Sequence, residues 1–161
     1  MRSKLAAYIV IVAVVFAAGC VDDGAQATAQ TKPVSATWIE PQLIDDTVVI
    51  PVQTIEESMN THFKMETSAG EIAVMAYMLG DEIVVRSNVC PPCGSIGFSL
   101  QDELLICDAC RTTFDTGTGQ GIQGACVDYP KENIPYEETE GNVMIKIDDI
   151  VIAHMNTVQR G

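Results

Sequence analysis

Two pairs of cysteines in the middle of the chain form its clearest chemical pattern. Cys90 and Cys93 enclose two prolines, Cys107 and Cys110 enclose Asp-Ala, and thirteen residues separate the pairs. Because a CxxC turn aims two sulfur atoms at one point, two facing turns supply the four thiolates of a tetrahedral site. Zn²⁺ and iron–sulfur centres both take this ligand set, and the spacing is close to that of zinc ribbons. The pattern therefore predicts a metal site and leaves the metal open.

The first twenty residues have the pattern of an export signal. Arg2 and Lys4 give a positive start, residues 5–18 are an apolar run, and small residues precede Cys20. This resembles a lipoprotein signal, in which Cys20 carries the lipid after cleavage. A retained anchor helix is the alternative, although the run is shorter than the ~20 residues of a bilayer span. We expect the chain to be tethered to the cell membrane on its extracytoplasmic face.

Export bears on the state of the cysteines, because thiols outside the cytosol tend to form disulfides unless a metal holds them. Five cysteines remain once Cys20 is set aside, so complete pairing within one chain is impossible. A four-thiolate site with Cys126 beside it accounts for this odd number more simply than two structural disulfides. Cys126 is then an additional ligand, a thiol next to the ligands, or a free thiol.

The charge of the chain excludes one class of partner. The formal net charge is −13, and cleavage after the signal would remove two of the nine basic residues. A strongly acidic surface disfavours nucleic acid and anionic substrates. It is compatible with attracting cations, and also with nothing more than solubility.

The chain divides into a signal or anchor (residues 1–20), a small and polar flexible linker (21–35) and one domain (36–161) with its cysteine core at 88–130. Within the domain, β-branched and alternating stretches predict strands, and no long helical period is visible. The expected elements are a strand at 47–52 that Pro51 places at a sheet edge, a helical turn at 55–59, a three-stranded meander at 61–86, a hairpin at 96–106, and closing strands at 142–147 and 150–154.

Methionines and histidines outside the cysteine core are assigned no ligand role. Met65, Met75 and Met78 are expected to fill apolar gaps in a core. His62 has no neighbouring ligand partner, and His154 is placed on a terminal strand. With two histidines in the chain and no Ser/His/Asp pattern, independent enzymatic catalysis is poorly supported.

The cysteine core resembles the FtrD-like family of membrane-associated iron–sulfur proteins. The resemblance covers about residues 61–153 and is carried by both CxxC pairs, Gly97-Phe98, Phe114 and the Gly-Ala-Cys element that ends at Cys126. The family usually has Gly-Gly-Cys-Asn-Pro at this last element. The resemblance implies an iron–sulfur cluster held by Cys90, Cys93, Cys107 and Cys110, and a partner that is a membrane permease of an iron transport system or a redox protein.

A second resemblance is to Rieske domains. Residues 106–117, which contain Cys107-Asp-Ala-Cys110, Phe114-Asp115 and Gly117, look like the second ligand loop of such a domain. Cys93 and Cys110 would then replace two histidines. The expected fold is mainly β, a small Rieske-like or zinc-ribbon-like β-domain with two CxxC loops at one end. Four thiolates bring more negative charge than two thiolates and two histidines, so we expect a low-potential [2Fe–2S] centre if iron is present.

Three functions remain open at this point. The first is an anchored extracytoplasmic iron–sulfur protein for electron transfer or metal handling beside a membrane transport or redox system. The second is a structural zinc-binding module that uses the same four thiolates. The third is thiol–disulfide exchange at either CxxC pair, with Cys126 as the resolving thiol.

Overall fold

A computed structural model describes residues 32–159, which form three four-stranded sheets and two helices. The central sheet has the order β1-β4-β5-β6, with the strands β1 (Thr37–Trp38), β4 (Asn60–Thr67), β5 (Gly70–Leu79) and β6 (Glu82–Ser87). β4, β5 and β6 pair antiparallel in sequence order, and β1 adds parallel to β4. The predicted three-stranded meander is confirmed.

The second sheet has the order β11-β12-β3-β2, with the strands β2 (Gln42–Ile44), β3 (Thr47–Pro51), β11 (Glu137–Thr139) and β12 (Asn142–Lys146). The prediction that Pro51 marks an edge strand is wrong, because β3 lies between β12 and β2. Pro51 is tolerated because β2 pairs only with residues 47–49 of β3, which leaves the strand's last residue without a partner on that side.

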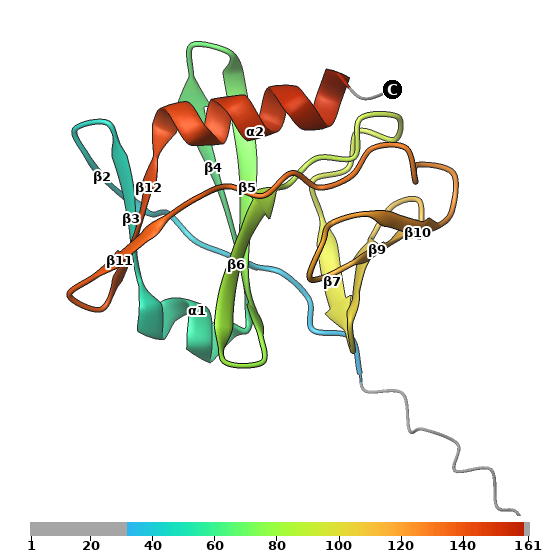
Figure 1. Ribbon diagram of the computed structural model, residues 1–161, viewed down its shortest axis with the longest axis horizontal. Coiled ribbons are helices and arrows are strands. Elements are labelled where there is room, and N and C mark those ends of the chain that lie inside the picture. The colour runs from blue at the N-terminus through green and yellow to red at the C-terminus, as the bar shows by residue number, and fades with distance from the viewer. Residues whose placement is uncertain (1–31, 160–161) are drawn as a thin grey trace, which may run out of the picture.

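Two helices flank these sheets. The predicted helical turn is helix α1 (Val52–Ser58), whereas the predicted closing strand at 150–154 is part of helix α2 (Ile147–Gln159). His154 therefore lies on a helix. The β-branched residues suggested a strand, but Ile150, Ala153 and Thr157 are buried at helical spacing. Figure 1 shows α2 lying across the strands of the two sheets.

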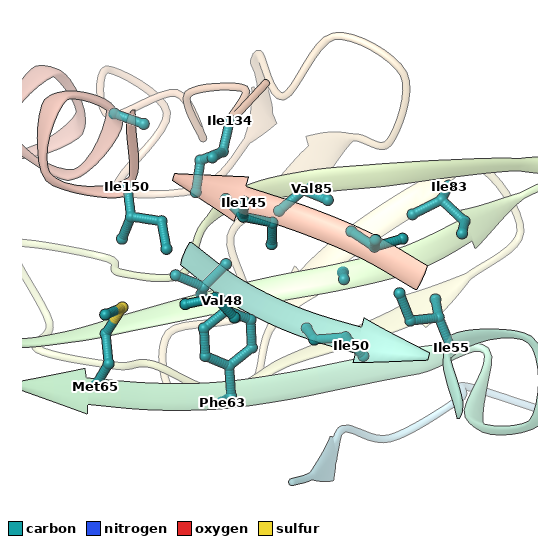
Figure 2. Packing of buried hydrophobic residues seen from close by; sticks show 14 of the residues in the cluster. Val48, Ile50, Ile55, Phe63, Met65, Ile83, Val85, Ile134, Ile145 and Ile150 are labelled. Atoms are coloured by element: carbon teal, nitrogen blue, oxygen red, sulfur yellow. The ribbon is translucent and has the colours of Figure 1, made fainter. Parts of the chain in front are cut away.

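The larger hydrophobic core lies between these two sheets, under α2. Figure 2 shows side chains from β3, β4, β6 and β12 pointing toward one another, including Ile50, Phe63, Val85 and Ile145. All four are fully buried. Burial of a side chain of this size stabilises the fold by about 1.5–3 kcal/mol.

The third sheet carries the cysteines and has the order β10-β9-β8-β7, with the strands β7 (Phe98–Gln101), β8 (Leu104–Cys107), β9 (Thr113–Asp115) and β10 (Gly121–Gln123). All its pairs are antiparallel, and the predicted hairpin is β7–β8. In Figure 1 this sheet lies on the opposite side of β5 and β6 from β3 and β12.

Strand β5 is the wall between two cores. Ile72, Val74 and Ala76 face the larger core, while Met75 and Tyr77 face a second core with Cys90, Phe98, Leu100, Leu105, Cys107, Phe114 and Cys126. Because successive strand side chains point to opposite faces, a strand buried on both faces reads as the apolar run seen in the sequence. Met65 and Met75 are buried and Met78 packs against the larger core, as expected for all three.

The structure describes the segment before the domain only from residue 32 onward. Val34 exchanges two backbone hydrogen bonds with Leu100 of β7, at N···O distances of 2.7 and 2.9 Å. The predicted export signal, which includes Cys20, lies outside the described residues. Most of the predicted linker lies outside them as well.

Candidate metal centre

The two CxxC segments form turns with the same backbone hydrogen bonds. The carbonyl of Cys90 accepts from the amide of Gly94 at 2.8 Å, and that of Cys107 accepts from Arg111 at 2.9 Å. The amides of the same two cysteines donate to carbonyls five residues further on, those of Ser95 and Thr112. Each turn thus folds the chain back on itself and turns two sulfurs toward the same side.

Both turns require a left-handed residue directly after the second cysteine. Gly94 has φ +69° and Arg111 has φ +60°. Glycine adopts this conformation freely, whereas a residue with a Cβ atom loses about 1–2 kcal/mol there. Arg111 therefore holds a conformation that the surrounding structure must impose.

The turns bring together the four cysteines predicted as ligands. The Sγ atoms of Cys90, Cys93, Cys107 and Cys110 all lie within 4.8 Å of one another. The Cys90–Cys110 and Cys93–Cys107 Sγ distances are 3.9 and 3.7 Å, so each of these close pairs joins the two loops. Cys90 and Cys107 are buried, Cys110 is partly exposed and Cys93 is exposed. The site therefore has an inner side and a side open to solvent.

Close contacts between the loops set this geometry. The amide of Asp108 donates to the carbonyl of Gly97 at 3.0 Å, and the Ser99 hydroxyl donates to the Asp108 carboxylate at 2.7 Å. A Cβ atom on Gly97 would lie 2.8 Å from Asp108 Oδ2. A side chain at position 97 would thus displace the Asp108 carboxylate, which accepts the hydrogen bond from Ser99.

Cys126 lies beside the four ligands, as its sequence position suggested. Its Sγ is 3.7 Å from Cys110 Sγ, and its amide donates to Thr112 Oγ1 at 3.2 Å. Cys110 Sγ is also 3.2 Å from this hydroxyl oxygen. The backbone at Gly124 has φ +123° and packs directly on Thr112, where a Cβ would meet the threonine at 2.5 Å. Thr112 therefore links Cys126 to the second ligand loop.

The surroundings of Cys90, Cys107 and Cys110 shift the pKa values of their thiols in different directions. Burial raises the pKa of Cys90 and of Cys107, since a thiolate in an apolar site loses its hydration. Burial also opposes ionisation of Cys110, but hydrogen bonds with Thr112, Cys107 and Cys93 outweigh it and lower its pKa to about 6. Without a cation between them, the sulfurs cannot all be thiolates, because like charges this close repel.

Two buried cations contact side chains of the second core, and neither was recognised from the sequence. Lys131 is 1% exposed, and its Nζ lies 4.4 Å from the centroid of the Phe114 ring. Arg86 donates to Tyr77 Oη at 2.9 Å, to the Lys131 carbonyl at 2.9 Å and to the Gly117 carbonyl. Lysine and arginine read as surface residues in a sequence, so only the packing reveals their position.

His62 is also buried near the first loop, but it is not one of the clustered metal-ligand groups among residues 32–159. Its Nδ1 accepts from Asn88 Nδ2 and its Nε2 faces Asn60 Oδ1, both at 3.0 Å. Asn60 Nδ2 donates in turn to the Phe98 carbonyl. Trp38 meets the imidazole edge-on. Burial lowers the pKa of His62 to about 4, so the ring is neutral at pH 7 and ties β4 to both ends of the first loop.

The four sulfurs fit the expected groups. Cys₄ ligand sets hold iron–sulfur clusters as well as structural zinc. A tetrahedral ion with metal–sulfur bonds of about 2.3 Å places its sulfurs about 3.8 Å apart. The inter-loop Cys93–Cys107 and Cys90–Cys110 distances here are 3.7 and 3.9 Å. Cys90, Cys93, Cys107 and Cys110 would hold the bound group, whether a single ion or a cluster.

Comparison with known proteins decides the family. The family model for FtrD-like membrane iron-sulfur containing proteins matches residues 40–156. The chain belongs to the FtrD-like family. With its four converging cysteines, it is a metal-binding iron–sulfur protein of a membrane-associated family. No curated protein matches the sequence with significance.

One solved structure supports the expected fold of this FtrD-like protein. A chain in the complex of reduced oxygenase and oxidized ferredoxin in carbazole 1,9a-dioxygenase superposes with a TM-score of 0.52 at 16% identity. The match covers 65% of this chain and 95% of the other. At this identity the likeness concerns the fold alone, and it agrees with the mainly β, Rieske-like domain expected from the sequence. Between residues 32 and 159, no helix is long and apolar enough to cross a membrane.

Cysteine substitutions test the ligand set. In Cys107→Ala the bound metal should fall to a small fraction of the wild-type amount, because one of four clustered sulfurs is removed. Cys126→Ala is the matched control and should keep its full metal, since Cys126 lies outside the group of four. Metal per chain is measured by elemental analysis. Equal loss in both variants would instead make Cys126 a ligand, and full metal in Cys107→Ala would contradict the four-sulfur site.

The buried histidine predicts a pH dependence of stability. The pKa of His62 falls from 6.5 to about 4 on folding, so below pH 6.5 the unfolded chain binds a proton that the folded chain does not. The free energy of unfolding should therefore be greatest above pH 6.5 and decrease toward pH 4, by roughly 3 kcal/mol in total. Urea unfolding of wild type and of His62→Gln at several pH values measures this. The variant should lack this part of the slope, and identical slopes would refute the assignment.

Proposed function

We propose that this protein transfers electrons at the extracytoplasmic surface of the cell membrane, with a [2Fe–2S] cluster on Cys90, Cys93, Cys107 and Cys110. The observation that carries the proposal is the convergence of these four sulfurs in a chain of an iron–sulfur family. A bound cluster would supply reversible uptake of one electron. The surrounding residues then determine how the cluster is held, how far it is exposed and which charges it meets.

The unequal exposure of the four cysteines would let a redox partner exchange electrons with the cluster from one side. Cys93 is exposed, and so are Pro92 and Gly94 on either side of it, whereas Cys90 and Cys107 are buried. A partner that docks on this turn would approach the sulfur of Cys93 directly. The inner cysteines keep the other side of the site away from water.

Histidine-based acid–base catalysis has little support among residues 32–159. Within residues 32–159 the two histidines are His62, which is neutral and held by two asparagines, and His154 on α2. Neither belongs to the cluster of potential metal ligands in this part of the chain. Electron transfer needs no proton donor at the site, so it suits these surroundings better than an independent enzymatic activity.

The iron–sulfur family and the Rieske-like fold, with its two loops at one end of a β-domain, support two irons over one. If Cys93 and Cys110 stand where a Rieske domain has its two histidines, one iron would take Cys90 and Cys107 and the other Cys93 and Cys110, so each iron would have one cysteine from each loop. Four thiolates and an acidic chain should give the cluster a low potential.

A structural zinc site is the second candidate, and a specific observation favours it. The inter-loop Sγ distances of 3.7 and 3.9 Å are also those expected around one tetrahedral ion. Zinc would stabilise the same two turns and carry out no redox chemistry. Thiol–disulfide exchange is a weaker third candidate, because both CxxC pairs follow strands and not the start of a helix.

The membrane location rests on the N-terminal sequence. Lipid attached to Cys20 would hold the domain at the outer face, and residues 21–35 would act as a spacer. A membrane permease that imports metal ions, or a membrane redox protein, is then the partner within reach. Metal handling for such a permease is the alternative use of the same site.

Purification under anaerobic conditions tests the proposed cluster. The full chain should contain about two iron atoms and two sulfide ions, show visible absorption, and give an electron paramagnetic resonance signal after reduction. A colourless protein with one zinc ion would refute the electron-transfer proposal in favour of a structural site. Metal-free protein with reversible disulfides would support thiol exchange.

Fractionation of cells tests the anchor. Wild-type protein should be found with membranes, and Cys20→Ser should release most of it, because the residue that carries the lipid is gone. Cys126→Ser is the control for loss of a cysteine as such and should stay with membranes. If Cys20→Ser remains membrane-bound, the N-terminal segment is retained as a helix anchor and lipid is not required.

A further inference from the structure

Lys131 is an almost completely buried lysine. Its side chain is 1% exposed, although lysine is one of the residues least often buried. The Nζ atom donates to the carbonyls of Val89 at 2.7 Å and Tyr129 at 2.8 Å. It also lies 4.4 Å from the centroid of the Phe114 ring and 5.3 Å from that of Phe98. These contacts hold the ammonium in one place but supply no full negative charge.

The negative charges that act on Lys131 come from the cysteines. Burial lowers the pKa of its ammonium group, and the charges that raise it again are those of Cys90, Cys107, Cys126 and Cys93. The carbonyl that it binds belongs to Val89, the residue directly before Cys90. The ammonium thus lies against the second core, in which Phe98 and Phe114 pack with the buried Cys90, Cys107 and Cys126.

The backbone of Lys131 is fixed as firmly as its side chain. Its amide donates to the Gly119 carbonyl at 2.9 Å, and its own carbonyl accepts from Arg86 Nη1 at 2.9 Å. A Cβ atom on Gly119 would come within 2.2 Å of that carbonyl oxygen, so the two segments are in close contact. The position of the charge is therefore set by the fold before any metal binds.

We propose that Lys131 is the buried counter-cation of the four-thiolate site and that, given the proposed electron-transfer function, it raises the midpoint potential of the cluster. Four thiolates leave the site with a net negative charge, and an added electron increases that charge by one. A fixed ammonium nearby favours the more negative state, and at a buried position solvent and salt screen this attraction little. Lys131 does not contact the cluster in this proposal. It acts by holding a positive charge near it.

This effect opposes that of the acidic surface. The chain carries 22 acidic and nine basic residues, a surplus that disfavours reduction of the cluster. Exposed charges are weakened by water and ions, whereas Lys131 is 1% exposed and is screened less. One buried cation can therefore offset part of a much larger surface charge.

Redox titration of the cluster-loaded full chain tests the proposal. Lys131→Met and Lys131→Gln both remove the charge, and Gln keeps a hydrogen-bond donor, so both should shift the midpoint potential to more negative values. Lys131→Arg keeps the charge and should stay near wild type. Lys64→Met is the matched control, because Lys64 is 43% exposed and paired with Glu71, and it should change the potential little. The Lys131 shift should persist at high salt.

A purely structural role would give a different result. If Lys131 only ties residue 89 to residue 129, the neutral variants should lower the melting temperature and leave the potential unchanged, which would overturn the proposal. A shift in Lys131→Met that Lys131→Gln does not share would assign the effect to hydrogen bonding and would overturn it as well.

A second measurement keeps the inference separate from the identity of the metal. Co²⁺ binding to the metal-depleted full chain also creates a negative four-thiolate site, so the neutral variants should bind it about tenfold more weakly, or worse, at fixed pH. Lys131→Arg should match wild type. If the protein proves to hold zinc, electron transfer fails while this test still applies, and equal Co²⁺ affinity in Lys131→Met and wild type would refute the counter-cation.

Discussion

Electrostatic repulsion between four sulfur atoms is the constraint around which this domain is arranged. The atoms lie within 4.8 Å of one another, partly buried, where four free thiolates would repel strongly. A bound cation removes the repulsion, and the metal then becomes part of the folding energy. The local structure serves this requirement. Two matching turns aim the sulfurs, Gly97 leaves room for the Asp108 carboxylate, and Lys131 adds a buried positive charge.

Strand β5 connects this site to the rest of the fold. One face of the strand belongs to the larger core between the sheets, and the other supports the cysteine sheet through Met75 and Tyr77. Tyr77 Oη donates to the Thr116 carbonyl at 2.6 Å and accepts from Arg86. The cysteine sheet thus packs against β5, which supports the ligand loops although the core on this side is the smaller of the two.

Much of the fold followed from local patterns, and the errors have identifiable causes. The meander and the β7–β8 hairpin were predictable because alternation and turn residues are local signals. The prediction of a closing strand at 150–154 was wrong. Ile150, Val151 and Ile152 favour a strand locally, but the segment packs against β5, β6 and β12 as a helix that buries Ile150 and Ala153. Pro51 indicated an edge strand, but β3 is an inner strand. It can end in proline because the short strand β2 does not extend as far as Pro51. Tertiary packing overrides weak local preference.

The sequence by itself indicated the family and the four cysteines that come together, because a CxxC turn is closed by hydrogen bonds within six residues and needs no distant partner. It also indicated that Cys126 returns to the site. Only the tertiary structure decided how the two loops meet, which cysteine is exposed, and that Lys131, Arg86 and His62 are buried. These features depend on segments far apart in the chain meeting at β5, and no local pattern records which side chain such a meeting will bury.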